Sequence, residues 1–110
     1  MAVIVYTTDP AELLKAIKEE MAKKVVETWS VDTDGEFTHT PPQWKNEAWL
    51  RPSIESDRLV FNILTPKGKT LNRATYAVYH GRFIEMLLAH FDLKFSEAKA
   101  TALPESGDIL

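Results

Sequence analysis

The chain has 110 residues, of which 45% are hydrophobic and 26% charged, with a net charge of −3 and no cysteine. These proportions are those of an ordinary globular domain that buries about two-thirds of its surface without a metal or disulfide, and the missing cysteines exclude disulfides, thiolate metal sites and cysteine nucleophiles. The acidic balance makes nucleic acid an unlikely partner. With no signal pattern and no apolar run of about 18 residues, we expect a soluble, cytoplasmic protein that has neither membrane contact nor a cofactor.

The N-terminal part of the chain predicts a strand followed by a helix. Residues 2–6 (AVIVY) form a short apolar run rich in β-branched side chains, which is typical of a buried strand. Asp9 and Pro10 then provide an N-cap and a first helical residue. Apolar residues recur at helical spacing from there to about Lys24, so we expect a half-buried helix over residues 10–24.

The dipeptide Asp-Gly that follows, ending at Gly35, predicts a hairpin between two strand-like runs. A three-residue loop with Gly35 at positive φ pairs Val31 with Phe37 and Trp29 with His39. A two-residue loop breaks these pairs, so apolar matching favours the longer loop.

The second half of the chain predicts two more strands, a long helix and a final strand. Strand patterns cover residues 48–54 and 58–64, the period then becomes helical over residues 73–91, and residues 93–102 alternate again. The last residues, PESGDIL, predict a flexible tail.

The resulting order is β-α-β-β-β-β-α-β. This order indicates an α+β fold with a mainly antiparallel sheet and two helices on one face, a ferredoxin-like variant with an extra hairpin. We expect a single domain over residues 1–103 and a flexible C-terminal tail over residues 104–110.

The helix predicted over residues 73–91 is apolar around most of its circumference. Leu88 and Gly81 widen one edge of its apolar arc, and only a strip around Arg82 and Glu85 suits solvent. A single sheet does not cover so wide an arc. A neighbouring chain, a curved sheet or a ligand cavity must cover the remainder.

Polar aromatic residues inside this arc are candidates to line a pocket between the helix and the sheet. They are His80, Tyr76 and Tyr79, and His39 joins them if its strand face meets the helix. His80 and His90 are ten residues apart, about 15 Å along a helix, so they do not bind one metal ion. The alternative for His80 is an ordinary core residue bonded to a backbone carbonyl or a tyrosine. For His90 it is a favourable interaction with the helix dipole, and for His39 it is a surface residue with aromatic neighbours.

The loop before the long helix carries basic residues that are candidates to bind an anion: Lys67, Lys69 and Arg73. It is not a P-loop, since Ile63 stands where that motif requires glycine. The acidic hairpin around Gly35 is not a calcium loop either, because Pro41 falls where that loop requires a bidentate glutamate. We therefore expect no metal site.

Candidates for a partner surface are Trp44, an aromatic residue in a polar loop, and Met86, at the second edge of the apolar arc. Together these patterns favour a small non-enzymatic binding domain that acts as a homodimer or with a protein partner. The alternative is a small-molecule-binding protein or cofactor-free enzyme, in which a small apolar ligand occupies the pocket beside the long helix.

Overall fold

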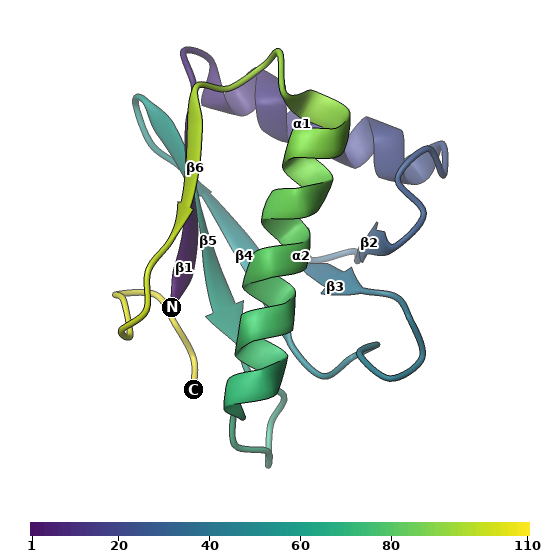
Figure 1. Cartoon of the computed structure of the whole chain (residues 1–110), viewed down its shortest axis with the longest axis vertical. Helices are drawn as coiled ribbons and strands as arrows, with labels where there is room; N and C mark the ends of the chain where they lie inside the picture. The colour runs from purple at the N-terminus through teal and green to yellow at the C-terminus, as the bar shows by residue number, and fades with distance from the viewer.

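A computed structural model describes residues 1–110 and confirms the α+β class, with two helices packed on a six-stranded sheet (Figure 1). The elements in chain order are β1 (Ala2–Tyr6), α1 (Pro10–Ala22), β2 (Trp29–Val31), β3 (Phe37–His39), β4 (Trp49–Ile54), β5 (Arg58–Leu64), α2 (Arg73–Phe91) and β6 (Glu97–Ala100).

The sheet has the order β2-β3-β4-β5-β1-β6, and every pair of neighbouring strands is antiparallel. Leaving out the β2–β3 hairpin gives β-α-β-β-α-β, so nothing in the topology conflicts with a ferredoxin-like variant. The predicted hairpin register is confirmed: Trp29 pairs with His39 and Val31 with Phe37, while Gly35 has a φ of 79°.

Both helices begin where a side chain caps their free N–H groups. The Asp9 carboxylate accepts a hydrogen bond from the Glu12 N–H at 3.2 Å, and the Asn72 side chain accepts one from the Thr75 N–H at 2.7 Å. Neither helix combines the length and the apolarity needed to cross a membrane.

One hydrophobic core joins both helices to the same face of the sheet, and Phe83 of α2 lies near its centre. The Phe83 ring centroid is 4.6 Å from that of Phe61, 5.0 Å from that of Trp29 and 5.8 Å from that of Phe37. Leu13 and Ile17 of α1 belong to the same cluster. This packing leaves the opposite face of the sheet without helices.

The segment expected to be a flexible tail is hydrogen-bonded to β5. The Ile109 N–H donates to the Ile63 carbonyl at 3.0 Å, and the Thr65 N–H donates to the Ile109 carbonyl at 2.7 Å. β1 pairs with β5 only as far as Asn62, so the end of β5 has unpaired backbone groups. The C-terminal segment satisfies them by continuing the ladder beyond β1.

The final strand is shorter than expected. It covers Glu97–Ala100 rather than residues 93–102, because the chain leaves α2 through a loop in which Leu93 is 96% exposed.

Candidate functional site

The surface of α2 that points away from the core is unusually apolar for a solvent-facing helix. At 100° per residue it forms one continuous face, opposite the buried residues Tyr79, Phe83 and Leu87. We call it the outer face of α2. It consists of Ala74, Ala77, Val78, Gly81, Arg82, Glu85, Leu88 and Ala89.

Gly81 lies in the middle of this outer face. A Cβ atom added at Gly81 meets no other atom within 4 Å, and its φ is not in the left-handed region, so nothing within the chain requires glycine there. Glycine in a helix interior costs about 1 kcal/mol relative to alanine. A shallow hollow of about 340 Å³ lies over Gly81, between Ala77, Val78, Arg82 and Glu85.

The charged residues of the outer face pair with each other rather than with another element. Arg82 Nη1 lies 3.1 Å from Glu85 Oε2, and both side chains are more than half exposed. Leu88 follows one turn later with 55% of its surface exposed. The outer face is thus an apolar strip with one ion pair, and no other part of the chain covers it.

The four predicted pocket residues lie on the core side of α2 but form two separate pairs. Tyr76 and His80 lie with ring centroids 4.6 Å apart, and Tyr79 and His39 with centroids 6.2 Å apart. Neither of the two main hollows in the structure is lined by any of these residues.

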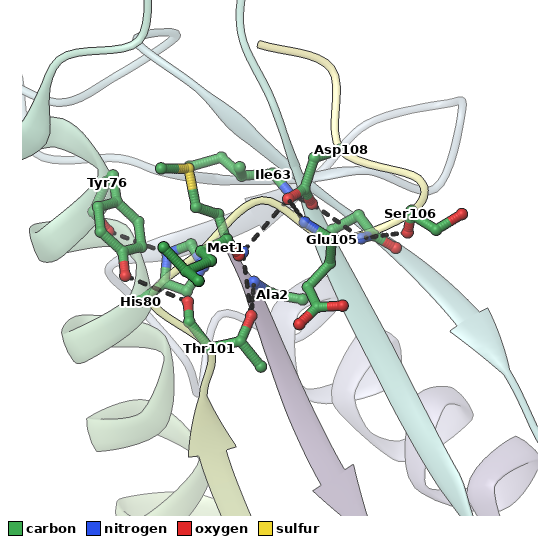
Figure 2. Close-up of polar contacts among 11 residues, drawn as sticks. Met1, Ala2, Ile63, Tyr76, His80, Thr101, Glu105, Ser106 and Asp108 are labelled. Atoms are coloured by element: carbon green, nitrogen blue, oxygen red, sulfur yellow. Dashed lines mark hydrogen bonds and ion pairs between the residues drawn. The ribbon is translucent and has the colours of Figure 1, made fainter.

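The first pair belongs to a polar network that joins α2 to the chain ends (Figure 2). His80 Nδ1–H donates to the Tyr76 carbonyl at 2.9 Å, and the Tyr76 hydroxyl donates to the Thr101 carbonyl at 3.1 Å. The Met1 ammonium donates to Thr101 Oγ1 at 3.0 Å and lies 3.3 Å from an Asp108 carboxylate oxygen. Burial lowers the pKa of His80, which is 3% exposed, so its ring is neutral.

His80 Nε2 is buried without a hydrogen-bond partner. With Nδ1–H donating to a carbonyl, this second nitrogen is an acceptor that lacks a donor. The backbone of Tyr76 and that of Met1 both contact the His80 ring, so the ring is packed between α2 and the start of the chain.

The second pair holds the β2–β3 hairpin against α2. His39 Nδ1–H donates to the Thr28 carbonyl at 2.7 Å, and the His39 ring stacks on Trp29 with centroids 4.7 Å apart. The Tyr79 hydroxyl donates to the Trp44 carbonyl and lies 3.0 Å from Thr38 Oγ1. Burial lowers the pKa of His39 and raises that of Tyr79, so both side chains are neutral at physiological pH.

The two predicted partner-surface residues do not form a common surface. Met86 is only 4% exposed, because it lies on the side of α2 that packs against the sheet. Trp44 is half-buried, since its indole packs against the core while its carbonyl accepts the Tyr79 hydroxyl. The exposed apolar surface of α2 therefore lies around Leu88 and not around Met86.

The basic residues before α2 are all exposed and lie apart from any hollow described in the structure. Lys69 Nζ pairs with Glu47 at 3.4 Å, and the Asn72 side chain already occupies one of the helix N–H groups. Lys67 in the loop and Arg73 at the start of α2 form no salt bridge, and both are exposed to solvent.

Three acidic residues of the β2–β3 turn place carboxylate oxygens within 4.8 Å of one another: Asp32, Asp34 and Glu36. Their contacts are local. Asp32 Oδ1 accepts the N–H groups of Asp34 and Glu36 at 2.9 Å, and Glu36 pairs with Arg51 at 2.8 Å. These hydrogen bonds and the ion pair explain why the three carboxylates lie close together in the turn.

A second hollow lies at one end of the sheet, and the sequence did not reveal it. It has a volume of about 700 Å³ and is formed by the β1–α1 connection, the β4–β5 turn and the α2–β6 loop. These segments are far apart in the sequence, so no motif with a fixed spacing predicts the hollow. The one local signal is the exposed Leu93, an apolar residue in a loop.

The fold and these surfaces define a small α+β domain with an exposed apolar helix face and one terminal cleft. No protein-family model, curated protein or solved structure matches the chain.

Proposed function

We propose that this protein is a non-enzymatic binding domain that self-associates as a homodimer through the outer face of α2. The observation that carries the proposal is the composition of that face. Small or apolar residues cover it from Ala74 to Ala89, and only Arg82 and Glu85 are charged. A helix that faces water normally carries polar residues there.

A second copy of the chain fits this face better than an unrelated partner, because the face is complementary to itself. In an antiparallel pair with Gly81 facing Gly81, Leu88 lies over Ala74 of the other copy, since the two residues are each seven positions from Gly81. The small residues allow the helices to approach closely, as the shortest helix packing distances require. Such a contact has the two-fold symmetry of most homodimers.

Electrostatics permit the same arrangement. The Arg82–Glu85 pair is internal to each helix, so the face has no net charge to repel its copy. The two ions are also free to exchange partners across the contact.

A pocket between α2 and the sheet receives less support. The side chains expected to line it (His80, Tyr76, Tyr79 and His39) pack as two separate pairs with backbone partners. The aromatic rings of the core occupy the space between the helix and the strands.

The test is the oligomeric state of the wild type and of two variants. We expect sedimentation velocity to show a concentration-dependent dimer up to about 200 μM, and Leu88→Glu to raise the dissociation constant more than roughly tenfold, because it buries a carboxylate in an apolar contact. Val25→Glu is the matched control, since Val25 is 52% exposed and lies off α2. A wild type that remains monomeric, or equal effects of both variants, would overturn the proposal.

A further inference from the structure

The cleft of about 700 Å³ has the size of a small-molecule site. The three connections that form it lie at the upper end of the molecule as drawn in Figure 1. Its walls combine acidic, hydroxyl and apolar side chains. They come from Tyr6–Asp9, Glu12 and Leu13 on one side, Ser56 and Asp57 on the second, and Leu93–Ser96 on the third.

Hydrogen bonds between the three connections hold the cleft in a defined shape. Thr7 is 8% exposed; its hydroxyl donates to the Lys94 carbonyl at 2.8 Å, and its N–H donates to the Asp57 carbonyl at 3.0 Å. The Ser96 hydroxyl donates to the Tyr6 carbonyl at 3.2 Å. Because hydrogen bonds join the connections, the cleft is already formed before any ligand binds, and ordering it on binding costs little conformational entropy.

The charges of the cleft select a cation. Asp9, Glu12 and Asp57 supply three carboxylates, against the ammonium of Lys94 and the guanidinium of Arg58, whose Nε lies 4.0 Å from an Asp57 carboxylate oxygen. The N-terminus of α1 would favour an anion, but Pro10 has no N–H group and the Glu12 N–H is already bonded to Asp9. The negative side chains therefore outweigh the helix dipole at this site.

The cleft also offers an apolar surface beside these carboxylates. The Leu93 side chain is 96% exposed at its rim, and Phe95, Leu13 and Tyr6 line its wall. Exposing the Leu93 side chain to water is energetically unfavourable, and in that position the leucine adds no packing energy to the chain. A ligand with a hydrocarbon chain next to its cationic group would use both surfaces.

We propose that this cleft binds a small amphiphilic organic cation, an aliphatic primary amine, with its ammonium at the carboxylates and its hydrocarbon chain against Leu93 and Phe95. The proposal does not rest on self-association, because no residue of the cleft belongs to the outer face of α2.

The experiment is a titration of the ¹⁵N-labelled protein with n-hexylamine, followed by amide chemical shifts. We expect saturable shifts confined to the three connections. The triple variant Asp9→Asn, Glu12→Gln, Asp57→Asn should weaken binding by about tenfold or more, since it removes every carboxylate at the site while asparagine preserves the helix cap. Leu93→Ser should also weaken binding, by roughly threefold or more.

Controls separate this site from general attraction to an acidic protein. Asp34→Asn removes a carboxylate outside the cleft and should leave the affinity for hexylamine unchanged. n-Hexanol, which has the chain without the charge, and inorganic phosphate should each bind at least tenfold more weakly. Equal binding by the folded triple variant, equal binding of hexanol, or shifts spread over the whole acidic surface would overturn the proposal.

Discussion

Replacing Gly81 with alanine separates the stability of the chain from its self-association, because the two should change in opposite directions. The added methyl group enters open space within the chain, and its backbone conformation suits alanine. Helix propensity then favours the variant by about 1 kcal/mol. For a domain of this size, that free energy raises the Tm by roughly 4 °C.

The same methyl group should weaken the proposed dimer. With Gly81 facing Gly81, two methyl groups meet at the closest point of the helix contact and hold the helices apart. Loss of close packing over this strip costs on the order of 1–2 kcal/mol, or about a five- to thirtyfold rise in the dissociation constant.

The assay combines thermal unfolding at about 2 μM, where the monomer should dominate, with sedimentation velocity at about 200 μM. Gly35→Ala is the contrasting control. Gly35 has a φ of 79°, so alanine there costs about 1–2 kcal/mol and should lower the Tm. A Gly81→Ala variant that unfolds at a lower temperature in dilute solution, or that dimerises as tightly as the wild type, would refute this reasoning.

Two further predictions concern the network at the chain ends. Burial holds the pKa of His80 below its ordinary value of 6.5, so the free energy of unfolding should reach its full value above pH 6.5 and fall as the pH drops below it. Urea titrations between about pH 8 and 5 should show this dependence on pH. An equally steep dependence in His80→Phe would contradict the assignment to His80. Asp108→Ala should cost about 1–3 kcal/mol, because Asn62 Nδ2 loses an acceptor at 2.8 Å and the Met1 ammonium loses its carboxylate partner. Faster hydrogen exchange at Ile109 should accompany that loss, while Asp108→Asn, which keeps an acceptor, should lie closer to the wild type.

The hairpin shows how far local sequence reasoning reaches. Its register follows from a turn dipeptide and from matching apolar residues a few positions away, so the pairing of Val31 with Phe37 could be derived without tertiary information. The N-cap at Asp9 is equally local, since the carboxylate contacts an N–H group three residues later.

The C-terminal segment shows where that reasoning ends. Its composition is that of a tail, and only the extra length of β5 beyond β1 provides the backbone partners that Ile109 uses. Asp108 likewise accepts a hydrogen bond from Asn62, a residue of β5 that is far away in the sequence. No property of the last residues by themselves reports these contacts.

The candidate sites divide in the same way. The helical period of residues 73–91 predicted an apolar surface too wide for one sheet, but both edges of the arc are alike in sequence. Packing covers the edge with Met86 and leaves Leu88 exposed. The cleft around Thr7 could not be predicted at all, because it exists only where three distant connections meet.

The sequence by itself therefore determined the class of fold, the cap of the first helix and the register of the hairpin, since each depends on periodicity and on contacts a few residues apart. Tertiary structure alone decided which side of α2 faces solvent, where the chain end pairs and where the cleft lies. The long helix was apolar around most of its circumference in the sequence. The sheet covers only one side of it, and the uncovered side carries Gly81 and Leu88.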